Sequence, residues 1–188
     1  MFDGLILSLS KEEFREWLLE NNSKAKECFV KISRSKDCPK GCLNYLDALE
    51  EALCFGWIDS VIYPSHEKYC CVQRFSPRIK NSSWTELNKA RVRRLIKLGL
   101  MHESGLKAFK NAKEFYIDED IQTAFKNNKA AYENFKKMPI LYQKVRIDTI
   151  QRYKKNRETF ERRLKKLIDN CEKNILFGEW NDNGKLIE

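Results

Sequence analysis

Glycine, proline and histidine are scarce in this sequence, with 7, 4 and 2 residues among 188. No stretch rich in proline, glycine or serine marks a flexible linker, so we expect the parts of the chain to follow one another directly. A glycine-rich phosphate loop and a dinucleotide-binding fingerprint are also missing. The sequence therefore contains neither of these two motifs of nucleotide-binding enzymes.

Long hydrophobic runs are absent as well. No apolar run approaches the roughly 20 residues that a membrane-spanning helix needs. The first residues, Met1 to Leu7, lack the basic flank and the small-residue cleavage site of a signal peptide. We therefore expect a cytoplasmic protein that does not bind membranes. In a reducing compartment the seven cysteines are expected to be free thiols rather than disulfides.

Charge is abundant in this chain. Charged residues make up 34% of it and hydrophobic residues 42%, which is typical of a globular protein with a charged, helix-rich surface. A length of 188 residues fits one domain, or one domain with an appendage. The formal net charge is +9, so the protein is expected to attract anions.

Hydrophobic periodicity predicts an α+β fold, in which a small antiparallel sheet packed with helices precedes a mostly helical C-terminal half. Ser10 and Glu13 form a capping box at the start of a first helix, which ends at Asn21 and Asn22. Strands are expected over 28–32, 57–63 and 69–75. Further helices are expected between Asn44 and Gly56, between Ser83 and Gly99, over 103–113, 119–127, 129–138 and 139–155, and around 160–171.

Three regions follow from this pattern. An α+β core with a basic segment is expected over residues 1–100, and a helical half packed on it over 101–178. The last residues, 179–188, form a polar tail that we expect to be frayed.

A basic segment runs from Arg74 to Lys97. It contains eight basic residues against one acid, Glu86, and carries seven of the nine net positive charges. Arg74 and Arg78 flank the exit of a strand, shortly before a helix that is expected to begin at Ser83, where backbone N–H groups can bind a phosphate or carboxylate. Two interpretations stay open: a solvated basic face, or a surface that recognises an anion or nucleic acid.

Several blocks of the sequence resemble one known family. They run from Glu51 to Asp59, from Gln73 to Arg78, and from Ser83 to Thr85 with Asn88 and Arg91. In this order they are similar to the YdeI/OmpD-associated family, also described as bacteriocin-protection proteins. The resemblance extends loosely from about Ser10 to Lys173. The turn from Tyr153 to Phe160 departs from the Ala-Lys-Lys-Pro-Glu-Thr-Arg run common in that family.

The resemblance implies a binding site rather than a reaction. Carried over residue by residue, it implies these ligand-binding residues: Asp59, Gln73, Arg74, Arg78, Asn88, Arg91, Trp57 and Trp84. We expect the three arginines to line one anion pocket, with Asp59 orienting them. The alternative is that the tryptophans pack the sheet against the helices while Asp59 pairs with an arginine.

Signs of a metal site or of catalysis are few. Cys38, Cys42, His66 and the pair Cys70-Cys71 can be combined into a zinc site, but their spacing is loose, so we expect free thiols and no metal. His66 and His102 belong to no catalytic motif, and Glu50 and Glu51 diverge on a helix. An enzymatic role would rest on Asp59 with Arg74 and Arg78, and we expect neither enzymatic activity nor a cofactor.

Two classes of function remain after these exclusions. In the first, a basic pocket around Arg74, Arg78 and Arg91 binds a small anionic ligand, such as a phosphate-containing metabolite or an acidic cell-envelope precursor. In the second, the protein binds nucleic acid, and Phe75 and Trp84, which lie among basic residues, stack on bases.

Overall fold

The computed structural model describes residues 5–186 of the chain. It consists of two compact units: the first combines residues up to Ser83 with Arg91–Ala112, and the second combines Trp84–Ala90 with the chain from Lys113 onward. The expected regions were 1–100 and 101–178, whereas these two units divide mainly between Ala112 and Lys113, and one helix contributes to both.

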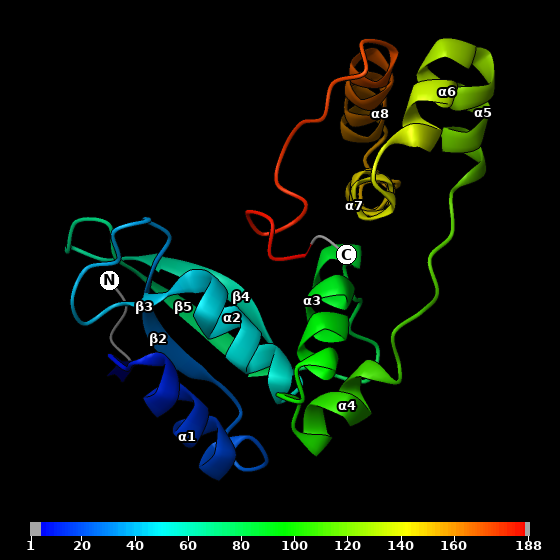
Figure 1. Cartoon of the computed structure of the whole chain (residues 1–188). Helices are drawn as coiled ribbons and strands as arrows, with labels where there is room; N and C mark the ends of the chain where they lie inside the picture. Colours follow the sequence, from blue (N-terminus) through cyan, green and yellow to red (C-terminus); the bar gives the residue numbers. More distant parts are fainter. Residues whose placement is uncertain (1–4, 187–188) are drawn as a thin grey trace. The chain divides into compact units, whose positions relative to one another are not determined.

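A mixed five-stranded sheet forms the centre of the first unit (Figure 1). The strands are β1 (Ile6–Leu7), β2 (Cys28–Ser33), β3 (Leu43–Asn44), β4 (Trp57–Pro64) and β5 (Cys71–Pro77). Their order is β1-β2-β5-β4, and β3 also pairs with β2. The expected antiparallel arrangement holds for β2, β5 and β4, but β1 and β3 lie parallel to β2. The α+β prediction is thus confirmed, with a mixed rather than purely antiparallel sheet.

Two helices pack on one face of this sheet, α1 (Lys11–Asn21) and α2 (Tyr45–Cys54). The capping box of α1 is confirmed, because Ser10 accepts from the backbone N–H of Glu13 and the Glu13 side chain accepts from that of Ser10. The ring of Phe14 lies 5.6 Å from that of Phe75, so the odd-numbered residues of β5 face the helices.

The end of α2 is joined closely to α4 (Glu103–Phe109). Gly56 follows α2 with φ +77, a backbone conformation that favours glycine. A Cβ at this position would also come within 2.9 Å of the Ala108 Cβ. The Ser104 hydroxyl donates to the Phe55 carbonyl at 3.0 Å, which fixes the start of α4 against the end of α2.

Helix α3 (Glu86–Lys97) contributes residues to both units. Its N-terminus differs from the prediction, which placed the cap at Ser83. The Thr85 hydroxyl accepts a hydrogen bond from the Asn88 N–H at 3.0 Å, so Thr85 caps the helix.

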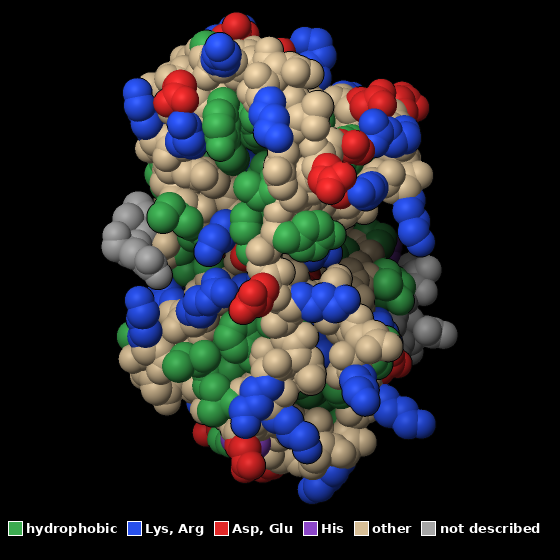
Figure 2. Space-filling view, turned by 90° about the vertical axis from the view of Figure 1, so that its right-hand side faces the viewer, with side chains coloured by type: hydrophobic (Ala, Val, Ile, Leu, Met, Phe, Trp, Pro, Cys, Tyr) green, Lys and Arg blue, Asp and Glu red, His purple; other side chains and the backbone are tan. Residues whose placement is uncertain are grey.

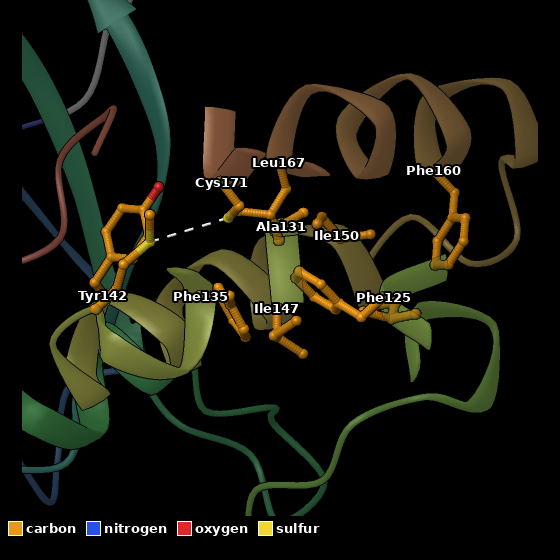
Figure 3. Packing of buried hydrophobic residues seen from close by; sticks show 11 residues of the cluster. Phe125, Ala131, Phe135, Tyr142, Ile147, Ile150, Phe160, Leu167 and Cys171 are labelled. Atoms are coloured by element: carbon orange, nitrogen blue, oxygen red, sulfur yellow. Dashed lines mark hydrogen bonds between the residues drawn. The ribbon is translucent and has the colours of Figure 1, made fainter. Parts of the chain in front are cut away.

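The second unit contains four more helices, α5 (Glu119–Asn127), α6 (Lys129–Lys137), α7 (Ile140–Gln151) and α8 (Arg157–Glu172). Figure 3 shows their shared core, in which Phe125 and Phe135 stack with ring centroids 4.5 Å apart. The polar tail was expected to fray, but Trp180 packs edge-on against Tyr142 at 5.8 Å. The end of the described chain, after α8, is therefore part of this unit, while residues 187–188 lie outside the described range.

One disulfide overturns the expectation of free thiols throughout. Cys42 and Cys70 are bonded, with their Cα atoms 6.6 Å apart, and they join the segment before β3 to the β4–β5 hairpin. The other five cysteines are free. Among residues 5–186, no three His, Cys, Asp or Glu side chains come together in a way that can hold a metal ion.

Candidate anion-binding cavity

The first unit places Asp59 and Arg91 near one tyrosine. The Tyr45 hydroxyl donates to Asp59 Oδ2 at 2.9 Å, and the Arg34 guanidinium lies 3.7 Å from the centre of the Tyr45 ring. Burial raises the pKa of Tyr45 to about 12, Asp59 adds to the rise, and Arg34 and Arg91 oppose it. Asp59 thus has a tyrosine as its hydrogen-bond partner, where an arginine was the alternative expected.

Arg74 faces the other side of the sheet from Asp59. In the ladder Asp59 pairs with Phe75, which faces α1, and side chains of successive residues in a strand alternate between faces. On its own side Arg74 donates to Glu27 Oε2 at 2.7 Å and to the Ser60 hydroxyl at 3.0 Å. The sheet therefore separates Arg74 from the group around Asp59 and Arg91.

Gln73 and Arg78 make contacts that hold the backbone. Gln73 is fully buried, and its Nε2 donates to the Val61 carbonyl at 3.1 Å, inside the irregularity between Asp59 and Ile62 that interrupts the β4–β5 ladder. Arg78 Nη1 donates to the Ser83 carbonyl at 3.1 Å.

The aromatic residues of the predicted site are buried. Trp57 is 1% exposed and meets Trp17 edge-on at 5.8 Å, as expected of a core residue. Phe75 is 0% exposed and Trp84 8%, so neither presents a ring face on which a base can stack. Trp84 and Asn88 belong to the second unit, whereas the other predicted site residues belong to the first.

Part of the charge in the basic segment is neutralised by acids that the fold brings to it. Arg94 pairs with the buried Glu50 at 3.1 Å, and Lys89 pairs with Glu86 where both side chains are only 5% exposed. Arg74 pairs with Glu27. On the face drawn in Figure 2 the Lys and Arg side chains are spread among hydrophobic and acidic ones rather than gathered in one patch. The charge counted along the sequence therefore overstates the field of this segment.

A cavity of about 500 Å³ lies in the second unit, between α7, α8 and the segment that follows α8. Its lining is basic and apolar and contains no acid: Arg146, Thr149, Ile150, Arg162, Arg163, Lys166, Leu167, Phe177 and Gly178. The acids nearby pair with other cations, such as Asp148 with Arg152 and Asp169 with Lys165. Among residues 5–186, no carboxylate forms an ion pair with any of the four cations in the lining.

Neutral groups hold three of these cations in place. Arg146 donates to the Glu179 carbonyl at 2.6 Å and lies 5.2 Å from the centre of the Phe177 ring. Arg163 donates to the Thr149 carbonyl at 3.0 Å and lies against the Tyr153 ring. Lys166 lies 5.0 Å from the Phe177 ring centre. Because carbonyls and rings position cations without cancelling their charge, the full charge remains available to an anion.

Arg146 is the most constrained of these cations. Its Nε is buried without a hydrogen-bond partner among the described residues. Burial lowers the pKa of Arg146, and the Arg163 guanidinium acts in the same direction, while Tyr142 and the Glu179 carboxylate oppose them. A partly buried cation without an ion-pair partner is costly, and an anion in the cavity would offset that cost.

Sequence reasoning missed this cavity although a signal was present. From residue 140 to 172, ten basic residues stand against five acids, and Arg146 with Thr149 and Arg163 with Lys166 recur at helical spacing. Outside the basic segment, the formal charges of the whole chain nearly cancel. This sum hides the excess of basic residues between 140 and 172. The contribution of Phe177 and Gly178 follows from the path of the chain after α8, which no periodicity indicates.

The protein is thus a small α+β protein whose helical part contains a cavity lined by four basic side chains. Among residues 5–186, none of these side chains forms an ion pair. The chain belongs to the family described as Domain of unknown function (DUF8412), whose model matches residues 6–108, more than half of its length. Residues 106–174 match the family described as Bacteriocin-protection, YdeI or OmpD-Associated. This confirms the resemblance for the C-terminal part, whereas the blocks that suggested it lie within the first match. No curated protein and no solved structure matches the chain significantly.

The boundary between the two matches lies near that between the two compact units. Most of the cavity lining falls within the bacteriocin-protection match, and only Phe177 and Gly178 lie beyond its end. Within residues 5–186, none of the helices has the length and apolar character that crossing a bilayer requires.

Proposed function

We propose that this protein binds a small anionic ligand in the cavity between α7 and α8, and that this binding is the activity of its bacteriocin-protection-like part. The observation that carries the proposal is that four cations line one cavity without an ion-pair partner among residues 5–186. Three of them are positioned in advance by rings and carbonyls, so little ordering is needed when a ligand binds.

The sequence offers a matched pair of variants for the test. Lys166 lines the cavity, whereas its neighbour Lys165 is 75% exposed and pairs with Asp169. A charge-assisted hydrogen bond contributes about 1.5 to 3 kcal/mol, so Lys166→Ala is expected to weaken anion binding about tenfold or more. Lys165→Ala, which removes the same charge from the same helix, is expected to leave it within about twofold of the unmodified protein.

The experiment is a calorimetric titration of the purified protein with inorganic pyrophosphate at low salt. Arg163→Ala provides a second loss, and Arg157→Ala is its control, because Arg157 pairs with Asp120 and Glu161 outside the cavity. Equal weakening by all four variants would mean that pyrophosphate responds to net charge alone, and the proposal would then be wrong.

Nucleic-acid binding is the second candidate, favoured by the net charge of +9. It predicts that each lysine or arginine variant, inside the cavity or outside it, weakens binding of a single-stranded oligonucleotide modestly. Each such variant would also lower the slope of log affinity against log salt by about one unit. The same variants therefore separate the two functions. Location in the cytoplasm is a separate proposal. The Cys42–Cys70 disulfide counts against it, because disulfides persist mainly in oxidising compartments.

A further inference from the structure

The size of the same cavity bears on the class of ligand. Its volume of about 500 Å³ falls in the range of pockets that hold whole small molecules, about 300 to 1,000 Å³. A single inorganic phosphate would occupy only a small part of this space. A ligand that fills the cavity therefore has a body in addition to its charged group.

The charge of the lining sets the charge of the ligand. Four cations face the cavity, and the carboxylate of Glu179 is near Arg146 without forming an ion pair. A monovalent anion would leave most of this positive charge uncompensated, including part of the charge on the half-buried Arg146 and Arg163, while Arg162 and Lys166 are exposed to solvent. Two or more negative charges, as on a phosphate ester or diphosphate, match the lining better.

The uncharged residues of the lining indicate what the organic part of the ligand, its body, contacts. Phe177 offers an aromatic wall, and Ile150 and Leu167 close the floor, where they also belong to the core. The Thr149 hydroxyl donates to the Arg146 carbonyl at 2.8 Å. Toward the cavity the Thr149 oxygen therefore serves as an acceptor, which suits a ligand that carries its own O–H or N–H donor.

We infer that the ligand is an organic phosphate of mononucleotide size, with at least two negative charges on its phosphate and a body that contacts Phe177 and Thr149. This inference rests on the proposed anion-binding function. In this arrangement Arg146, Arg163 and Lys166 bind the phosphate, and Phe177 and Thr149 determine which organic group is accepted.

The test compares two probes that share a diphosphate, inorganic pyrophosphate and adenosine diphosphate, by calorimetric titration of the whole protein. Adenosine diphosphate is expected to bind about tenfold tighter. Phe177→Leu keeps an apolar side chain but loses the aromatic ring that positions Arg146 and Lys166, so it should weaken both probes, and adenosine diphosphate about fivefold more than pyrophosphate. Thr149→Val is close in shape and keeps the backbone carbonyl that holds Arg163, so it should weaken adenosine diphosphate about fivefold while leaving pyrophosphate within about twofold. Leu176→Ala is the control, since Leu176 is 44% exposed and does not line the cavity.

The possible outcomes distinguish failure of this inference from failure of the proposed anion-binding function. If pyrophosphate binds in a Lys166-dependent manner but adenosine diphosphate binds no tighter, the ligand class is wrong and the anion site stands. If adenosine diphosphate binds tighter while Phe177→Leu and Thr149→Val leave its affinity unchanged, its body lies outside the cavity and the inference also fails. Failure of both probes to bind would remove the proposed function itself.

Discussion

The substitution Gly178→Ala tests the role of Arg146 in the cavity. It is expected to strain the backbone and also to displace Arg146, and a control variant distinguishes these two effects. The φ of Gly178 is +68, and a Cβ added there would lie 2.5 Å from Arg146 Nη1. An L-residue in this left-handed conformation costs about 1 to 2 kcal/mol, so Gly178→Ala is expected to lower the free energy of unfolding by that amount. The contacted atom is the end of a flexible side chain, so Arg146 is expected to move out of its position.

Gly99 provides the matched control. It has nearly the same backbone angle, φ +69, but an added Cβ would meet nothing within 4 Å. Gly99→Ala should therefore show the same strain of about 1 to 2 kcal/mol without displacing a cation. Only Gly178→Ala should also weaken pyrophosphate binding, by about tenfold or more if one charge-assisted hydrogen bond is lost.

The assay is urea unfolding of both variants, followed by calorimetric titration with pyrophosphate under conditions where both are folded. Similar unfolding midpoints with different affinities would support the role assigned to Arg146. If Gly178→Ala binds pyrophosphate as the unmodified protein does, or if Gly99→Ala weakens binding equally, the reasoning is refuted.

Three further predictions concern the rest of the chain. Protein denatured without reductant should expose five thiols to a thiol reagent and seven after reduction, and seven without reduction would exclude the Cys42–Cys70 bond. Glu51→Ala removes a buried acid with two basic partners and should cost about 2 kcal/mol in urea unfolding. Glu67→Ala removes an exposed acid and should cost less than about 1 kcal/mol, and equal costs would contradict this account. A hydrogen bond from a lysine ammonium lowers the pKa of Asp118, so its stabilising effect is present above the ordinary value of 3.8 and lost as pH falls below it. The difference in unfolding free energy between the unmodified protein and Asp118→Asn should therefore shrink below about pH 4, and a difference that stays constant would contradict the assignment.

Local signals predicted the elements of this fold well. The capping box at Ser10 and the hydrophobic periodicity over 119–127 lead to helices with nearly the expected bounds, because caps and apolar stripes act within a few residues. The parallel strands β1 and β3 were missed because each has two residues, too few for any alternation to be visible. Pairing with β2 makes them strands, and that pairing is a tertiary property.

The predicted site shows where sequence reasoning reaches its limit. Arg74 is adjacent in sequence to residues that face the helices, but the alternation along β5 turns it to the opposite face. Charge along the chain also does not reveal pairing, and Glu50 neutralises Arg94 from 44 residues away. The cations of the cavity are ordinary in the sequence, and they stand out only because, among residues 5–186, the fold gives none of them an ion-pair partner.

A structure of the protein crystallised with pyrophosphate tests the central claim most directly. The account predicts a bound anion whose oxygens lie within hydrogen-bond distance of Arg146, Arg163 and Lys166. An anion bound instead beside Arg74, Arg78 or Arg91, with the cavity between α7 and α8 free of it, would contradict the account.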